Sequence, residues 1–356
     1  METVRIGYVG CGMMAQKVHI PNIISLDDCE LLALAEVRPQ LGRRVQEFHG
    51  VPRMYASHEE LSADADVDAV AVSAQYAAQG EIAADLLRAG KDVFMEKPMA
   101  VTVEQAERIL DAERQGGGRL MVAYMKRYDR GNELVKRLVD EFRESGELGE
   151  LRYVRNHGFC GDWIAGLDTP MIGTDEPYPP GPEIWPDWCP EDRRRGYVGY
   201  LQQYTHNVNL LRWLLDAGGE VEVVAVDLDA EGGMRGVTIL NMAGVRCVIE
   251  SGGLPYHGWE EHTQLYFDKG WIRTEAPPLL LRNVPATVEV YRGDRDEKTE
   301  SRLFPAGGWT WSYKEEMRHF VHCVREGAPF RSPGSDALED VRTLEAIYRK
   351  FVEQQS

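Results

Sequence analysis

Short apolar runs alternate with amphipathic segments over the first 125 residues. Such runs, bounded by turn residues, are typical of buried parallel strands, and the segments between them have helical spacing. We expect strands at 4–9, 31–35, 67–73, 92–95 and 120–124, and helices at 15–18, 39–49, 79–89 and 103–115. This alternation predicts an α/β domain at 1–125 with the doubly wound parallel sheet of a Rossmann fold.

After residue 125 the apolar pattern changes. A connecting helix at 133–144 and the turn Gly146–Gly149 lead into strands that follow one another closely. We expect these strands at 151–159, 221–229, 236–241, 245–251, 263–267, 271–275 and 288–292, with helices at 197–215, 313–326 and 335–351. Such runs of strands predict an α+β second domain at 126–356, built on a large, mostly antiparallel open sheet.

Composition narrows the possible partners. The net charge of -18 and the pI near 5.0 repel nucleic acid and anionic membranes, so we expect neither as a partner and favour small neutral or cationic substrates. The six cysteines are scattered, without a Cys-x-x-Cys pair or clustered histidines, which predicts reduced thiols, a cytoplasmic location and no metal site. We also expect no secretory signal and no membrane span, since no suitable apolar run is present.

The first strand ends in a glycine-rich turn, Gly10-Cys11-Gly12-Met13-Met14-Ala15, of the form G-x-G-x-x-A. A preceding strand and a following helix are the context in which this motif binds dinucleotides. Gly10 permits the tight turn, Gly12 lets a pyrophosphate approach the backbone, and Ala15 lets helix and strand pack closely. We therefore expect this turn, including Met13 and Met14, to hold a cofactor at the helix N-terminus.

The second strand ends in Glu36. A carboxylate at this position accepts hydrogen bonds from the adenosine ribose hydroxyls and repels a 2′-phosphate, which favours NAD over NADP. Arg38 favours the opposite choice, because a guanidinium there could pair with that phosphate. We expect NAD.

The strand at 92–95 delivers Glu96-Lys97-Pro98 to the carboxyl edge of the sheet, where ligands of doubly wound folds bind. Lys97 could hold a substrate oxygen as a point charge or transfer a proton. A turn lysine is more often simply solvated, so its role depends on the motifs around it.

Two stretches of the second domain carry candidate substrate contacts. The Trp-, Pro- and Gly-rich loop 161–196 includes Asp162 and Trp163, which suit a sugar or glycoside through hydrogen bonds and apolar stacking. An oligomer contact or a self-packed surface loop would explain the loop equally well. On the helix 197–215, Gln202, His206 and Asn209 share one face. His206 is either a structural histidine or part of a binding or catalytic site.

The order of these motifs resembles the glucose-fructose oxidoreductase, inositol dehydrogenase and MocA family. Ala89-Gly90-Lys91 ahead of Glu96-Lys97-Pro98, the pair Arg127-Tyr128 and the turn Gly146–Gly149 match the family over nearly the whole chain. The resemblance implies NAD(P)-dependent oxidation of a secondary alcohol. It also implies that Lys97 contacts the reacting hydroxyl, that His206 binds or deprotonates it, and that Arg127 and Tyr128 lie at the substrate.

This chain departs from the family pattern at two places. Gln202 and Asn209 stand where the family usually has aspartates around the histidine, and Gln202 cannot accept a proton as a carboxylate would. The family's Thr-Pro-Asn-x-x-His segment beside the nicotinamide reads Ala74-Gln75-Tyr76-Ala77-Ala78-Gln79. The resemblance implies cofactor contacts for Ala74, Gln75, Gln79 and Glu96.

We therefore expect an NAD-dependent dehydrogenase that acts on a ring hydroxyl of a sugar, glycoside or cyclitol. The alternatives are an NAD-binding sensor or assembly protein without catalytic activity, and a redox-neutral enzyme that keeps its NAD bound. An open sheet needs covering, so we also expect a homodimer or homotetramer paired through the second domain.

Overall fold

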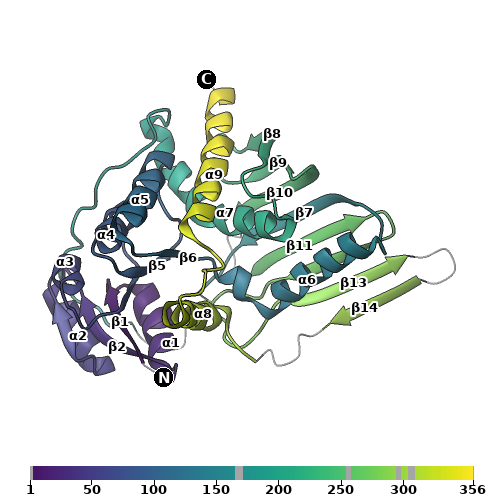
Figure 1. Ribbon diagram of the computed structural model, residues 1–356. Helices are drawn as coiled ribbons and strands as arrows, with labels where there is room; N and C mark the ends of the chain where they lie inside the picture. The colour runs from purple at the N-terminus through teal and green to yellow at the C-terminus, as the bar shows by residue number, and fades with distance from the viewer. Residues whose placement is uncertain (1–2, 165–170, 254–257, 294–297, 304–308, 356) are drawn as a thin grey trace. The chain divides into compact units, whose positions relative to one another are not determined.

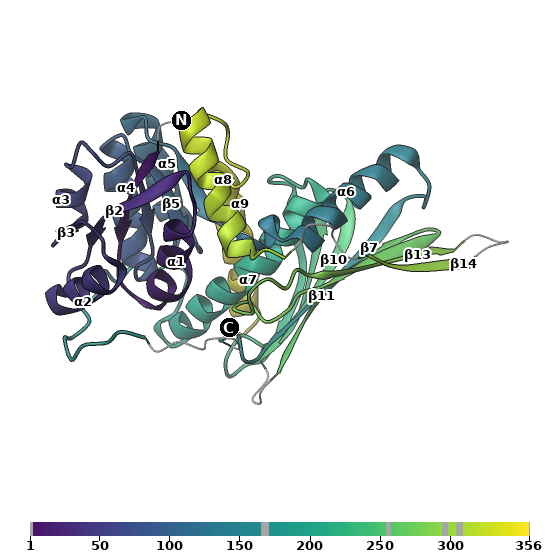
Figure 2. The same ribbon diagram turned by 90° about the horizontal axis from the view of Figure 1, so that it is seen from below.

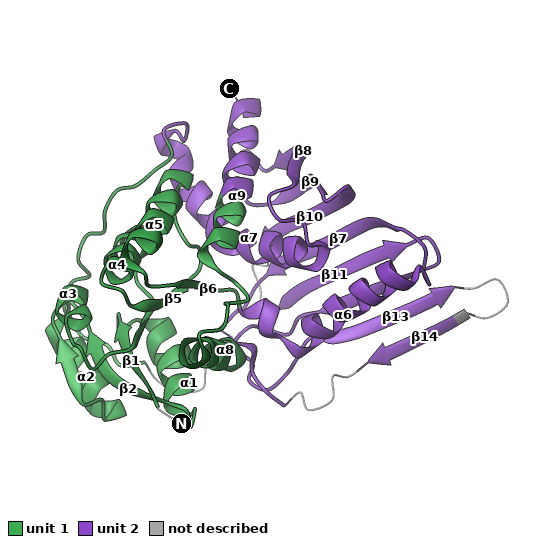
Figure 3. Ribbon diagram, in the orientation of Figure 1, with its two compact units in different colours: residues 1–124, 168–186, 313–341 green, residues 125–167, 187–312, 342–356 purple. Residues whose placement is uncertain are grey.

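The computed structural model describes residues 3–164, 171–253, 258–293, 298–303 and 309–355. The chain forms two compact units, coloured separately in Figure 3. Unit 1 comprises Met1–Tyr124, Asp168–Pro186 and Tyr313–Val341, and unit 2 comprises Met125–Leu167, Asp187–Ser312 and Arg342–Ser356. The part of the predicted loop at 165–170 lies outside the described residues.

Unit 1 is built on a six-stranded sheet in the order β3-β2-β1-β4-β5-β6, in which every neighbouring pair is parallel. Its strands are β1 (Val4–Val9), β2 (Cys29–Ala35), β3 (Arg53–Tyr55), β4 (Ala69–Val72), β5 (Asp92–Glu96) and β6 (Leu120–Ala123). Its helices are η1 (Ala15–His19), α1 (Ile20–Ile24), α2 (Pro39–His49), α3 (His58–Ser62), α4 (Tyr76–Arg88), α5 (Val103–Gly116) and α8 (Ser312–Glu326), and the first residues of α9 (Gly334–Gln355) also belong to it. This arrangement confirms the predicted Rossmann fold (Figure 1).

The core of unit 1 explains why its strands read as continuous apolar runs. β4 is buried at every position, because helices cover both faces of a parallel sheet. α5 illustrates the local signals: the Thr102 side chain caps its first turn, and Gly117 ends it in the left-handed conformation. At the edge of the sheet, Ser332 pairs with Val122 through two hydrogen bonds, so the backbone of β6 is not left open.

Unit 2 contains an eight-stranded sheet in the order β14-β13-β12-β11-β7-β10-β9-β8. Its strands are β7 (Leu151–Cys160), β8 (Val221–Leu228), β9 (Gly236–Met242), β10 (Val245–Gly253), β11 (Trp259–Phe267), β12 (Gly270–Glu275), β13 (Thr287–Gly293) and β14 (Lys298–Leu303). Neighbouring strands are antiparallel except β7 with β10, as the prediction of a mostly antiparallel sheet requires. The 3-10 helix η2 (Met125–Tyr128), α6 (Arg130–Ser145), η3 (Glu191–Arg193), α7 (Arg194–Leu215) and the part of α9 from Arg342 onward also belong to the unit.

One face of the second sheet is covered by helices. α6 packs on β12 and β13, and α7 packs on β7 (Figure 2). Side chains on β7 therefore alternate, with Val154 and Asn156 buried toward the helices and Tyr153 and His157 only partly buried on the other face.

Several local expectations differ from the structure. The first helix continues past Pro21 to Ile24, because proline is tolerated in the first turn of a helical segment and Pro21 lies in the first turn of α1. β3, α3 and β14 were not predicted, because they are short or lie in polar stretches.

The grouping of segments also differs from a single boundary near residue 125. The helix expected at 313–326 to close the second sheet is α8, and it packs in unit 1, where Phe320 meets Phe94 edge to face with ring centroids 5.6 Å apart. Residues 168–186 also belong to unit 1, although they follow β7 in the chain.

Candidate active site

The turn after β1 has the geometry that its glycines predict. Gly10 has a positive φ of 94°, and a Cβ there would lie 2.2 Å from the Ser73 carbonyl oxygen, so only glycine fits. At Gly12, by contrast, no atom of the described residues other than Gly12 and its chain neighbours lies within 4 Å of the position a Cβ would take. Ala15 is fully buried in the helix that follows, and Met13 and Met14 lie partly buried at the start of that helix. The turn therefore leaves open space against its backbone.

That space is part of a pocket in unit 1. Its walls come from the ends of β1, β2 and β4, from the segment after β3, and from one residue each of α4 and of the 168–186 segment. They consist of Val9, Gly10, Cys11, Gly12, Ala35, Glu36, Val37, Arg38, Ala56, Ser57, His58, Ser73, Ala74, Ile82 and Tyr178. The carboxyl ends of parallel strands meet here, as they do at the ligand crevice of doubly wound folds.

Glu36 lies buried in this pocket. Its carboxylate accepts the backbone N–H of Cys11 at 2.7 Å and so ties the end of β2 to the glycine turn. The same carboxylate accepts two bonds from the Arg38 guanidinium, at 2.8 Å from Nε and 3.1 Å from Nη2. The Glu36 carboxylate and the Arg38 guanidinium therefore form one ion pair in the pocket.

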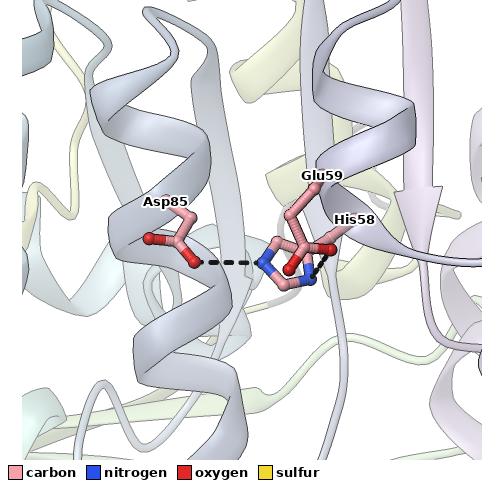
Figure 4. Close-up of side chains that lie close together, drawn as sticks. All are labelled: His58, Glu59 and Asp85. Atoms are coloured by element: carbon pink, nitrogen blue, oxygen red, sulfur yellow. Dashed lines mark hydrogen bonds and ion pairs between the residues drawn. The ribbon is translucent and has the colours of Figure 1, made fainter.

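His58 stands on another wall of the pocket. Figure 4 shows its ring between two carboxylates, with Nδ1 3.3 Å from Glu59 and Nε2 3.2 Å from Asp85. Within the described residues these three side chains form one group close enough to share a metal ion. Asp85 is also paired with Arg88 at 2.8 Å, and Glu59 is largely exposed, so we assign the group no metal.

Gln79 joins the loops after β4 and β5. Its side-chain oxygen accepts the Ala74 N–H at 3.2 Å, and its amide nitrogen donates to the Glu96 carbonyl oxygen. The residue is fully buried, so its geometry gives it the role of fixing these loops, whereas Ala74 is partly buried and Gln75 is exposed at the start of α4. Cofactor contacts of Gln75 and Gln79 stay predictions.

Lys97 follows β5 directly, and the peptide bond between it and Pro98 is cis. Its backbone N–H donates to the Glu96 carboxylate at 3.1 Å, while His19 Nε2 lies 2.8 Å from the same carboxylate. Glu96 and His19 are both buried. The buried Glu96 carboxylate thus fixes the backbone at Lys97, at the end of β5.

A second buried acid lies in this region and was not predicted. Glu316 on α8 is fully buried, and neither carboxylate oxygen has a hydrogen-bond partner among the described residues. Burial raises the pKa of Glu316 well above its usual value, the nearby charge of Glu96 raises it further, and Lys97 lowers it. The raised pKa favours the protonated form of the Glu316 carboxyl.

The predicted residues of α7 differ in burial. His206 and Asn209 are buried, whereas Gln202, one turn earlier, is exposed. Asn209 accepts a hydrogen bond from Arg127 Nε at 2.7 Å, so the predicted pair after the Rossmann sheet is joined to α7 within unit 2. Tyr128 beside Arg127 is buried as well. The prediction of one polar face is thus only partly reproduced.

The two residues predicted from the tryptophan-rich loop lie after β7. Asp162 donates its backbone N–H to Gly258 at 2.9 Å and is partly buried, while Trp163 is 38% exposed. Nearby, Lys126 and Glu261 form a buried ion pair that the sequence analysis did not single out. The signal for that pair was hidden, because its partners are 135 residues apart.

These features define a two-unit dinucleotide-binding oxidoreductase fold. Residues 4–124 match the family model GFO_IDH_MocA, described as an oxidoreductase family with an NAD-binding Rossmann fold. The inositol 2-dehydrogenase of Burkholderia cenocepacia is 36% identical over 340 residues, which cover 92% of this chain and 87% of that protein. The chain belongs to the GFO_IDH_MocA oxidoreductase family, which confirms the resemblance found in its motifs.

Solved structures share the fold over the whole chain. The aldose-aldose oxidoreductase from Caulobacter crescentus, solved with glycerol, has a TM-score of 0.76 at 20% identity, and the match covers 99% of this chain and 98% of that one. A 3-ketoreductase from Actinomadura kijaniata in complex with NADP has a TM-score of 0.72 at 21% identity, over 98% and 97% of the chains. Among the described residues, no helix is both long and apolar enough to cross a bilayer.

The pocket in unit 1 fits an NAD(P) cofactor. The cradle at Gly12 is one that a Cβ would fill, and it lies in the same pocket as the buried Glu36 carboxylate. This combination provides a close approach for a pyrophosphate and hydrogen-bond acceptors for ribose hydroxyls. Lys97 and the Ala74–Gln75 loop lie at the ends of the next two strands along the same sheet edge.

Proposed function

We propose that this protein is an NAD-dependent dehydrogenase that transfers hydride between nicotinamide and a ring secondary hydroxyl or ketone of a cyclitol, sugar or glycoside. The observation that carries the proposal is the pocket in which the open backbone at Gly12 and the buried Glu36 carboxylate lie together. Family membership and the position of Lys97 at the end of β5 support the same reaction class.

The side chains divide the work as follows. NAD, when bound, supplies the hydride acceptor. The Lys97 ammonium holds the reacting hydroxyl oxygen, and His206 accepts or donates its proton. Gln202 and Asn209 act as neutral hydrogen-bonding groups, and Asn209 also fixes Arg127. Because Gln202 cannot take a proton, proton transfer depends on His206 and Lys97.

NAD, rather than NADP, is the proposed cofactor. A free arginine near the ribose would favour a 2′-phosphate, but the Arg38 guanidinium is already paired with Glu36. The Glu36 carboxylate would repel a phosphate placed beside it. The fold alone does not separate the two cofactors, since the Actinomadura kijaniata ketoreductase was solved with NADP.

The proposed substrates are neutral polyols. A net charge of -18 disfavours anionic substrates, and the Burkholderia cenocepacia relative is an inositol 2-dehydrogenase. Asp162 and Trp163 offer a carboxylate and a partly exposed ring for hydroxyl and C–H faces of such a molecule. We propose that they contact the substrate, with Tyr128 supporting the site from its buried position beside Arg127.

A homodimer or homotetramer in the cytoplasm is part of the proposal. On the face of the second sheet opposite α6 and α7, Tyr153 lies near Tyr266 and Trp271 stacks on Tyr291, with all four partly buried. Aromatic surfaces of this kind are typical of protein interfaces. Pairing through this face would cover the open sheet.

A spectroscopic screen tests the proposed function. Purified protein is mixed with NAD or NADP and a panel of inositols, aldoses and glycosides, and the formation of reduced nicotinamide is followed by absorbance. We expect NAD reduction with at least one cyclic polyol and a weaker response with NADP. Bound NAD without turnover, and without product in long incubations analysed by mass spectrometry, would support the alternative of an NAD-binding sensor, which the loss of a carboxylate at Gln202 favours.

A further inference from the structure

A segment of the chain that follows β7 lies along the cofactor pocket of unit 1. We call residues 172–181 the strap. Its first residue is held at both backbone atoms by one side chain: Ile172 N–H donates to Gln16 Oε1 at 2.9 Å, and Gln16 Nε2 donates to the Ile172 oxygen at 3.0 Å. Gln16 also donates to the Cys11 oxygen at 2.8 Å. The strap therefore begins on the glycine turn and its helix.

The middle of the strap is fixed on α2. Arg38 at the N-cap of this helix makes no side-chain capping bond. Instead the Glu176 carboxylate accepts the backbone N–H groups of Gln40 and Leu41, each at 2.9 Å. Thr174 Oγ1 donates to the same carboxylate at 3.0 Å. Glu176, 136 positions away from Gln40 in the chain, thus caps the N-terminus of α2. This cap anchors the middle of the strap to α2.

Beyond Glu176 the strap enters the pocket wall. The Arg38 guanidinium lies over the Tyr178 ring, with Cζ 4.6 Å from the ring centroid. Tyr178 lines the pocket together with Gly12 and Glu36. Tyr178 is 51% exposed, so part of its ring surface is available to a ligand. Further on, a Cβ at Gly181 would lie 2.1 Å from Gln75 Oε1, so the strap reaches the loop after β4.

The strap thus runs from the glycine turn, past the ends of β2 and Arg38, to the loop after β4, and Figure 3 shows it in the colour of unit 1. A dinucleotide on the glycine turn has its adenosine at the β2 end of this path. We propose that the strap is part of the cofactor site, with Tyr178 as the aromatic wall for the adenine ring, and that it slows the exchange of NAD and NADH. This inference rests on the NAD binding in the proposed function.

The physical reason lies in the fixed position of the ring. An aromatic side chain that stacks on a base strengthens binding. Tyr178 is held by a cation–π contact with Arg38 on one side and by the capping carboxylate of Glu176, two residues before it. Because the ring is already ordered, little conformational entropy is lost when the base binds. We therefore expect the stronger binding to appear mainly as a slower dissociation of the cofactor.

The test measures NADH binding and release in the full-length protein by stopped-flow fluorescence and equilibrium titration. Tyr178→Ala should raise the NADH dissociation rate and the Kd about 10-fold or more, with an unchanged melting temperature. Tyr178→Phe keeps the ring and should behave as the wild type. Glu176→Gln weakens the anchor while keeping Tyr178, and should raise the dissociation rate by a smaller factor. Phe48→Ala, which removes an exposed ring of α2 outside the pocket, is the matched control.

The outcomes separate the strap from the proposed function. If the wild type binds NADH and Tyr178→Ala releases it at the wild-type rate with the same Kd, the strap has no role in cofactor binding and the inference is overturned. The same conclusion follows if Tyr178→Phe is as impaired as Tyr178→Ala, because then the hydroxyl and not the ring matters. If the wild type binds neither NADH nor NADPH, the proposed function fails, and the strap inference fails with it.

Discussion

The Arg38 guanidinium donates two hydrogen bonds to the buried Glu36 carboxylate, at 2.8 and 3.1 Å, within the pocket formed by the strand ends of unit 1. Glu36, a residue type that favours NAD, is therefore hydrogen-bonded to Arg38, a residue type that favours NADP. The arginine stays in place for a phosphate, but its charge is compensated. In the proposed cofactor site, the choice between NAD and NADP would then depend on the charge of Glu36.

Replacing Glu36 should change that choice. Glu36→Gln keeps an oxygen that can accept the Cys11 N–H, but it removes the negative charge that repels a 2′-phosphate and frees Arg38 to pair with it. We expect the ratio of kcat/KM for NADP to that for NAD to rise about 10- to 100-fold. Steady-state kinetics with both cofactors measures the ratio. An unchanged ratio would mean that Glu36 does not lie at the ribose.

Gly12→Val tests the pyrophosphate cradle. Because no described residue beyond the chain neighbours of Gly12 lies within 4 Å of the Cβ position, we expect the side chain to fit the free protein and to leave its melting temperature nearly unchanged. It would fill the space for the pyrophosphate, so NADH affinity should fall by at least about 100-fold. Gly253→Ala, where the nearest atom to a Cβ is 3.8 Å away in unit 2, is the control. Undiminished NADH titration by Gly12→Val would rule out this turn as the site.

Glu316→Gln should alter how stability depends on pH. The pKa of Glu316 in the folded protein is raised by burial, so below the unfolded value of about 4.5 both states hold the proton and the substitution changes little. As pH rises above that value, the unfolded chain ionises while the folded protein keeps its proton, which lowers the stability of the wild type. The variant lacks this loss.

The melting temperature of Glu316→Gln relative to the wild type should therefore increase between about pH 5 and pH 8. Glu326→Gln serves as a control, because Arg325 lowers the pKa of that exposed carboxyl, so the wild-type side chain is ionised in both states above about pH 5 and the difference in melting temperature should stay constant over this range. A difference between wild type and Glu316→Gln that stays constant with pH would show that Glu316 is ionised in the folded state.

Asn209→Ala should destabilise unit 2. The substitution removes the 2.7 Å bond to Arg127 Nε in a fully buried position, and a buried charged group that loses a hydrogen bond costs about 2–4 kcal/mol. Chemical denaturation measures the change. Gln202→Ala, on the same helix but exposed, should change the free energy of unfolding by less than about 0.5 kcal/mol. Equal effects of the two substitutions would contradict the assigned burial.

The sequence predicted the framework well where one local signal was sufficient. Gly10 and Gly12 behave as the motif requires, Glu36 follows the second strand, and Lys97 follows β5. These predictions succeeded because apolar periodicity and turn chemistry are properties of neighbouring residues.

Features that depend on distant partners were not predictable. Tyr178 and Glu176 were placed in a loop thought to cover the substrate or an oligomer contact, whereas their contacts are with α2 and Arg38 in unit 1. Glu316 read as an ordinary helix residue, although it is fully buried. On α7, helical periodicity placed Gln202 and His206 on one face, yet Gln202 is exposed and His206 is buried. Periodicity describes position around the helix axis, whereas burial also changes along that axis.

The most direct test of the account is the effect of Lys97→Met on hydride transfer and on NADH binding, measured in the same preparation with a polyol found active in the screen. Methionine keeps an unbranched apolar side chain, one atom shorter than that of lysine, and removes the charge. We predict that kcat falls about 1,000-fold or more while the Kd for NADH changes less than about threefold. Turnover at the wild-type rate in this variant would contradict the central claim that Lys97 acts on the substrate hydroxyl.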